Sequence, residues 1–156
     1  PDDWREALRT WAGMIRDAYR AHPWVLEIPR GQLSVLMPAS VRAADLGLAA
    51  LSGLDLADDE KIAAILLISQ HVVSMVELER SLAAEGGPVV TPEGAEALRE
   101  VVTAERYPHL APVMTRGGYI AAGEGVEPES VDDEYEFGLD MLIAGLESLA
   151  RRRGAA

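Results

Sequence analysis

Three histidines are the side chains of this 156-residue chain best suited to chemistry near neutral pH. His71 stands in the middle of an uncharged run, whereas His22 and His109 each stand next to a proline. The sequence has no cysteine nucleophile, no Glu-x-x-His pair, no Gly-x-Ser-x-Gly elbow and no glycine-rich phosphate loop. We therefore expect no catalytic residue, no cofactor and no metal site, and hence no enzyme activity.

His71 is the candidate with the most informative surroundings, because Ser69, Gln70 and Ser74 lie beside it in an otherwise apolar run. A buried polar group without a partner costs about 1 to 3 kcal/mol, so we expect the imidazole to be hydrogen-bonded. Two interpretations stay open. His71 is either a satisfied histidine in the core or at a dimer seam, or a polar group that orients a ligand in an apolar pocket.

Methionine and aromatic side chains could line such a pocket, because they adapt to flat, irregular ligands. Core packing explains the same residues equally well. Tyr107 and His109 lie on a proline-bounded turn that could be a pocket lid or a plain turn. The predicted ligand-binding residues are Trp11, Met14, Trp24, Met37, Gln70, His71, Met75, Tyr107, His109 and Met114.

Length and charge narrow the class of protein. A chain of 156 residues suits a single domain, predicted over residues 1–156. The net charge of −12 argues against a surface that tracks nucleic-acid phosphates. The only basic run, Arg151 to Arg153, suits the C-terminal end of a helix. The first segment is acidic and amphipathic, unlike a signal peptide, so we expect a cytoplasmic protein.

The longest apolar stretch runs from Ile62 to Val76 without a charge, proline or glycine. Acidic residues precede it, which favours a helix N-terminus there. At about 1.5 Å per residue the stretch spans roughly 23 Å, too short to cross a bilayer, so we expect a buried helix and no membrane contact. Apolar residues occur all round this helix, which predicts that something covers both sides. A second copy of the chain is a plausible second cover.

The rest of the chain predicts further helices and no strands. Asp3 caps a helix that Pro23 ends, and a second helix spans residues 37–52. A shorter helix starts after Thr91, and a last long helix starts after Ser130. The connection between the helix of residues 37–52 and the central helix is short, so these two helices should be antiparallel neighbours. The predicted fold is an all-α antiparallel helical bundle.

Four segments of the sequence carry a family resemblance: the opening DDWREALRTWAGMIRDAYRAHPWV, the pair GLAALSGLDLADDEKIAAILLI, the ERYPHL segment and the ending YEFGLDMLIAGLESL. They resemble the C-terminal domain of tetracycline-repressor-like (TetR family) transcriptional regulators, and the match extends over nearly the whole chain. The most specific parts are His22-Pro23-Trp24, Tyr107-Pro108, and Phe137-Gly138-Leu139-Asp140 leading into Gly145-Leu146-Glu147.

The resemblance implies a small-molecule effector bound between the helices and a homodimer formed by a four-helix bundle of the central and last helices. It also implies a separate N-terminal helix-turn-helix domain that binds DNA, which is expected to be absent from this chain. The magnesium-binding histidine and threonine of tetracycline-binding members have no evident match, so a metal–tetracycline chelate is not expected. The predicted dimer-interface residues are Leu66, Val73, Val76, Tyr135, Leu139, Leu142, Gly145, Leu146 and Leu149.

The leading hypothesis is therefore the effector-sensing and dimerisation domain of a bacterial transcriptional repressor. Effector binding would change the spacing of two DNA-reading heads. The alternative is a structural dimerisation module with a filled core and no ligand.

Overall fold

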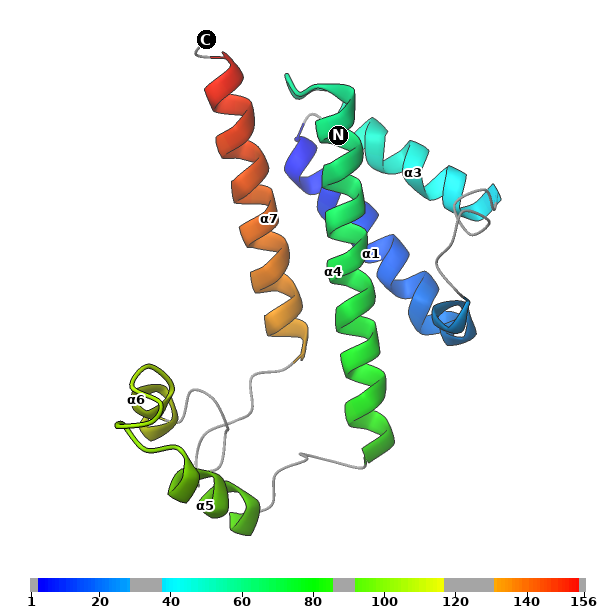
Figure 1. Cartoon of the computed structure of the whole chain (residues 1–156). Coiled ribbons are helices and arrows are strands. Elements are labelled where there is room, and N and C mark those ends of the chain that lie inside the picture. The colour runs from blue at the N-terminus through cyan, green and yellow to red at the C-terminus, as the bar shows by residue number, and fades with distance from the viewer. Residues whose placement is uncertain (1–2, 29–37, 86–91, 117–130, 155–156) are drawn as a thin grey trace. The chain divides into compact units, whose positions relative to one another are not determined.

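The computed structural model describes residues 3–28, 38–85, 92–116 and 131–154, and every regular element among them is helical (Figure 1). The prediction of an all-α fold is therefore confirmed. The predicted residues Met37, Thr91 and Ser130 lie outside the described residues. The elements in chain order are α1 (Trp4–Ala21), the 3-10 helix η1 (Pro23–Glu27), α3 (Pro38–Ala50), α4 (Asp58–Glu85), α5 (Pro92–Val101), α6 (Leu110–Thr115) and α7 (Val131–Gly154).

The chain forms two compact units. The first comprises Pro1–Glu79 and Val131–Ala156, and it contains α1, η1, α3, α7 and most of α4. The second comprises Arg80–Ser130 and contains α5 and α6. In this second unit α5 begins with Pro92, as expected for proline at a first helical position. The expectation of a single domain over residues 1–156 stays a prediction.

Helix α4 is longer than the uncharged run that predicted it. It has 28 residues, with Asp58, Asp59 and Glu60 in its first turn, where carboxylates favour the positive end of the helix dipole. By length and composition alone a helix of this kind could cross a membrane. The uncharged run was expected to be too short to do so, and that expectation does not extend to the whole helix. The core helix of a soluble protein has the same composition, and α4 packs within the first unit on both α1 and α7.

Ion pairs at both ends define the direction of α7 relative to α4. Arg153 near the end of α7 lies 2.9 Å from Glu60 at the start of α4. Asp132 at the start of α7 and Glu79 far along α4 both bind Arg16 of α1. The two long helices are therefore antiparallel, as Figure 1 also shows.

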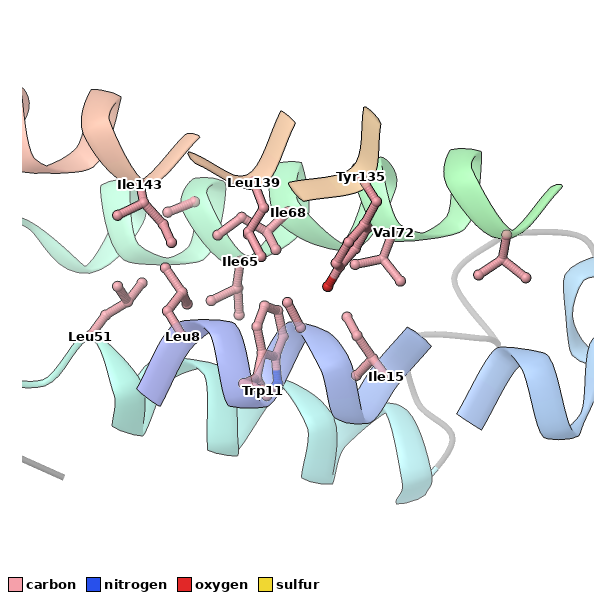
Figure 2. Close-up of a cluster of buried hydrophobic side chains, with 13 residues drawn as sticks. Leu8, Trp11, Ile15, Leu51, Ile65, Ile68, Val72, Tyr135, Leu139 and Ile143 are labelled. Atoms are coloured by element: carbon pink, nitrogen blue, oxygen red, sulfur yellow. The ribbon is translucent and has the colours of Figure 1, made fainter. Parts of the chain in front are cut away.

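The core of the first unit lies where α1, α4 and α7 meet (Figure 2). Each helix contributes side chains spaced three or four residues apart, the repeat that places residues on one helix face. Burying such a side chain contributes about 1.5 to 3 kcal/mol. The residues labelled in Figure 2 are Leu8, Trp11 and Ile15 from α1, Ile65, Ile68 and Val72 from α4, Tyr135, Leu139 and Ile143 from α7, with Leu51 after α3.

Helix α3 is held on α1 by Trp11. The indole Nε1 of Trp11 donates a hydrogen bond to the carbonyl oxygen of Ala43 at 2.7 Å. The ring lies against Gly47, where an added Cβ atom would come within 2.8 Å of it. A larger residue at position 47 would therefore push α3 away from α1.

A second glycine contact joins α4 and α7, and it supplies a test of the packing. A Cβ atom added at Gly138 would overlap the imidazole ring of His71. We expect Gly138→Ala to lower the free energy of unfolding by about 1 to 3 kcal/mol, because the ring must move and its hydrogen bond to Tyr135 must break. Chemical denaturation followed by circular dichroism measures this.

The matched control is Gly13→Ala in α1, where an added Cβ atom meets nothing within 4 Å. There the gain in helix propensity should raise stability by about 0.5 to 1 kcal/mol. Equal effects of the two substitutions would contradict the packing of Gly138 on His71.

Candidate functional site

A pocket opens between η1, α3 and α4 and is called the α3–α4 pocket below. Its volume is about 630 Å³, within the range of sites that bind small organic molecules. Apolar side chains form most of its wall, with a few polar groups among them. The lining residues are Tyr19, Val25, Leu26, Ile28, Ser40, Val41, Ala44, Asp45, Leu48, Leu66, Ser69, Gln70 and Val73.

The polar groups of the α3–α4 pocket come from α3 and α4. Ser69 donates its hydroxyl to the carbonyl oxygen of Ile65 at 2.7 Å, so the hydroxyl oxygen can still accept a hydrogen bond from a ligand. Asp45 is the only formally charged residue among the described lining residues. Its carboxylate lies 3.1 Å from Arg42, one turn earlier on α3, and both side chains are largely exposed.

A second depression, the α1–α3 groove, lies on the other side of α3. It has a volume of about 460 Å³ and is lined by Trp4, Ala7, Thr10, Trp11, Met14, Leu46, Ala49, Ala50, Ser52 and Gly53. Two predicted ligand-binding residues, Trp11 and Met14, are brought together here. Trp11 is also a core residue, since it is buried and carries the hydrogen bond to α3.

His71 points towards α7 and not into the α3–α4 pocket. Its Nε2 lies 2.9 Å from the carbonyl oxygen of Tyr135, and its ring stacks on the Tyr135 ring with centroids 5.6 Å apart. Position 71 is roughly 140° around the helix from Leu66, which lines the pocket, at about 100° per residue. The expected hydrogen bond is thus present, and the geometry matches a satisfied histidine between two helices.

The other predicted ligand-binding residues are dispersed. Gln70 lines the α3–α4 pocket, and Met75 packs against the core. Trp24 is 59% exposed on η1. Tyr107, His109 and Met114 belong to the second unit, and Met37 lies outside the described residues. Effector binding by this set stays a prediction.

A shallow groove between α4 and α7, the α4–α7 groove, lies on the face of the first unit that these two helices form. It is lined by Ala64, Leu67, Ile68, Met141, Leu142, Gly145, Leu146 and Leu149. Large apolar side chains in and beside the groove are exposed to solvent: Leu67 in its wall is 56% exposed and Met141 62%, and Phe137 on α7 is 69% exposed. These three residues define the outward face of α4 and α7, which is an exposed apolar surface.

The predicted dimer-interface residues divide among three places. Four of them line the α4–α7 groove: Leu142, Gly145, Leu146 and Leu149. Val76, Tyr135 and Leu139 are buried in the core of the same chain. Leu66 and Val73 line the α3–α4 pocket. Leu67, Phe137 and Met141 were not among the predicted residues, although Phe137 and Met141 are four residues apart on one face of α7.

A buried ionic cluster around Arg16 was also missed. The Arg16 side chain is only 7% exposed and binds both Glu79 of α4 and Asp132 of α7. Its guanidinium carbon lies 4.0 Å from the centre of the Tyr135 ring, a cation–π geometry. One feature of the sequence could have indicated this cluster: Arg16 follows Ile15 on the buried face of α1 and needs an acidic partner there. Its partners Glu79 and Asp132 lie far away along the chain.

Hydrogen bonds in this cluster shift the ionisation of its acids. Hydrogen bonds from Arg20 and Arg16 lower the pKa of Glu79, and those from Arg16 and Arg20 lower the pKa of Asp132. Burial raises the pKa of the Tyr135 hydroxyl, which has no hydrogen-bond partner among the described residues. The cluster therefore joins three helices through charges that depend on ionised carboxylates.

Comparison with known proteins places this architecture in a family. The family model "Tetracyclin repressor-like, C-terminal domain" matches residues 1–150. The chain belongs to the TetR-like C-terminal domain family. It is also 28% identical, over 97% of its length, to the HTH-type transcriptional repressor DrrR1 of Streptomyces coeruleorubidus, of which it covers 54%. The chain thus spans about half the length of this curated relative.

Membership in the TetR-like family confirms the resemblance seen in the sequence. TetR-family regulators are generally not enzymes, and they typically act on DNA as homodimers that respond to small-molecule effectors.

The ionic cluster predicts acid sensitivity of this TetR-like domain. A carboxyl whose pKa is lowered on folding stabilises the fold above its ordinary pKa, here 4.5 for Glu79 and 3.8 for Asp132, and loses that contribution as the pH falls through the folded pKa. We therefore expect the midpoint temperature of thermal unfolding to decrease as the pH is lowered below about 4.5. The double variant Glu79→Gln, Asp132→Asn should be less stable at pH 7 and show a shallower pH dependence.

The control removes two exposed carboxylates of the second unit, by Glu93→Gln and Glu105→Gln. Thermal melts at several pH values between 3 and 7 compare the three proteins. An unchanged acid slope in the Glu79 and Asp132 variant would contradict the assigned role of these two carboxylates.

Proposed function

We propose that this domain is the effector-sensing and dimerisation part of a bacterial transcriptional repressor. The observation that carries the proposal is the α3–α4 pocket, which combines a drug-sized volume with an apolar wall and a few polar groups in a member of the TetR-like family. The effector is a small apolar or aromatic molecule. The relative, of which the chain covers 54%, is named an HTH-type repressor, and on that basis we assign DNA contact to a further domain of a longer, cytoplasmic protein.

The proposed mechanism begins at α3. This helix separates the α3–α4 pocket from the α1–α3 groove, and the Trp11 hydrogen bond ties it to α1. A ligand that fills the pocket contacts Val41, Ala44 and Leu48 on α3, together with Leu66 and Val73 on α4. It therefore stabilises the arrangement of α3 that fits it best. A difference in affinity between two arrangements is what allows an effector to shift a population.

The proposed homodimer uses the outward face of α4 and α7. Large apolar side chains at Leu67, Phe137 and Met141 lose solvent when a second copy covers them, and each such burial contributes about 1.5 to 3 kcal/mol. Covering α4 and α7 with the same pair from a second copy gives a four-helix bundle. No membrane contact is needed to cover α4.

Effector binding is tested with Nile red, a neutral aromatic probe whose fluorescence increases in apolar sites. Val41 lines the pocket and is exposed, so Val41→Trp should block the pocket mouth without disturbing the core. We expect saturable Nile red binding and a thermal stabilisation that follows RT ln(1 + [L]/Kd). In Val41→Trp the Kd should be at least about fivefold higher, and the stabilisation at the same probe concentration correspondingly smaller.

The control Ala49→Trp places the same indole in the α1–α3 groove. If Ala49→Trp blocks the probe and Val41→Trp does not, the effector site is wrongly assigned. A domain that neither binds nor is stabilised by any apolar probe would instead fit the structural dimerisation module.

Dimerisation is tested by placing like charges on α7. In Phe137→Glu, Met141→Glu the two carboxylates stand where a second copy would bury them, so sedimentation should show monomers in place of dimers at micromolar concentration. The fold should survive, because both side chains are exposed within the chain. The control Val101→Glu changes a similarly exposed residue of α5 and should remain dimeric. A wild-type protein that sediments as a monomer would contradict the proposal.

A further inference from the structure

The charge pattern of the α3–α4 pocket narrows the chemistry of its ligand. Among the described lining residues, Asp45 alone carries a formal charge, and none of these residues is a lysine or an arginine. The chain as a whole carries a net charge of −12. An anionic ligand would therefore find no cation among the described lining residues and would enter against the field of the protein.

Asp45 gives the pocket one polar, solvent-exposed end, and the rest of the wall is mainly apolar. The Asp45 side chain is 68% exposed and lies on α3, one turn from Val41 and next to Ala44. The rest of the wall is formed largely by apolar side chains of η1, α3 and α4, including Leu26, Leu48 and Val73. A ligand with an apolar body and one charged end fits this arrangement if the charge is positive.

Arg42 competes for the same carboxylate. It pairs with Asp45 at 3.1 Å, in an exposed contact between residues three apart. Exposed pairs of this kind are weak, because water and salt screen both charges. A ligand ammonium that is held by the apolar wall can therefore share or replace Arg42 as the partner of Asp45.

We propose that the α3–α4 pocket selects amphipathic cations, and this inference rests on the proposed effector site. The flat apolar body of the ligand lies against α4, and its amine or aromatic cationic nitrogen lies beside Asp45. Carboxylates, phosphates and sulfonates are disfavoured. Neutral apolar molecules bind through the wall alone.

The test compares three fluorescent probes of similar size: ethidium as the cation, Nile red as the neutral probe and anilinonaphthalene sulfonate as the anion. Pocket binding is defined for each probe as the part that Val41→Trp removes and Ala49→Trp does not. In the wild-type domain we expect pocket binding of ethidium and Nile red, with the anion at least about fivefold weaker than the cation.

Two substitutions then change the charge in opposite directions. Asp45→Asn should weaken ethidium binding by about two- to fivefold at low salt, in keeping with an exposed ion pair, and leave Nile red unchanged. Arg42→Gln removes the competitor and should strengthen ethidium binding by a similar factor. The control Asp17→Asn makes the same change in net charge on an exposed position of α1 outside the pocket lining and should alter neither probe.

The outcomes separate this inference from the proposed function. Absence of Val41→Trp-sensitive Nile red binding would overturn the effector site itself. If Nile red binds as expected but Asp45→Asn leaves ethidium unchanged, or the anion binds as tightly as the cation, the selectivity for cations is overturned and the effector site stands. A loss of ethidium that Asp17→Asn reproduces would overturn the role of Asp45, because net charge alone would then explain it.

Discussion

The structure depends on how α4 is covered, because fifteen consecutive residues of this helix, 62–76, carry no charge and occur on every side of it. Water contact with such a surface is unfavourable by about 25 cal/mol for each Å² of apolar area. Helix α1 covers part of it through Leu8 and Ile15, and α7 covers another part through Leu139 and Ile143. The two candidate functional surfaces are the strips of α4 that remain. One, beside Leu66, forms the α3–α4 pocket, and the other, beside Leu67, belongs to the outward face of α4 and α7.

Local chemistry in the sequence was sufficient to predict the helices. The acidic first turn of α4, the cap at Asp3 and the proline that opens α5 all act within a few residues, so they can be recognised without knowledge of the fold. The family resemblance rested on the order of several short segments and was confirmed over residues 1–150. The length of α4 was underestimated because the helix continues past Val76 through charged residues, of which Glu77 and Arg80 are exposed and Glu79 binds Arg16.

The assignment of helix faces could not be predicted in the same way. Leu66 and Leu67 are neighbours in the chain, yet they line different surfaces, because successive residues point about 100° apart. Which stripe meets which helix depends on where α1 and α7 cross α4. For the same reason Tyr135 and Leu139 were expected at a dimer seam but are buried in the core, whereas Phe137 and Met141 are exposed. Arg16 was missed because its buried position depends on Glu79, which is 63 residues away.

The charged edge between α1 and α7 differs in kind from the apolar core beneath it. Arg5 binds Glu147 at 2.5 Å, Arg20 binds Asp132 at 3.1 Å, and Arg9 binds both Glu136 and Asp140. Glu136 and Asp140 are one helical turn apart, so a slide of α7 by one turn, about 5.4 Å, would leave Arg9 with a carboxylate in reach. At Arg9 the ion pairs therefore resist separation of the two helices more than they resist a slide of one turn. The register of α7 is therefore set mainly by the shapes of Tyr135, Leu139 and Ile143 in the core. The charged edge holds α7 against α1 without selecting that register.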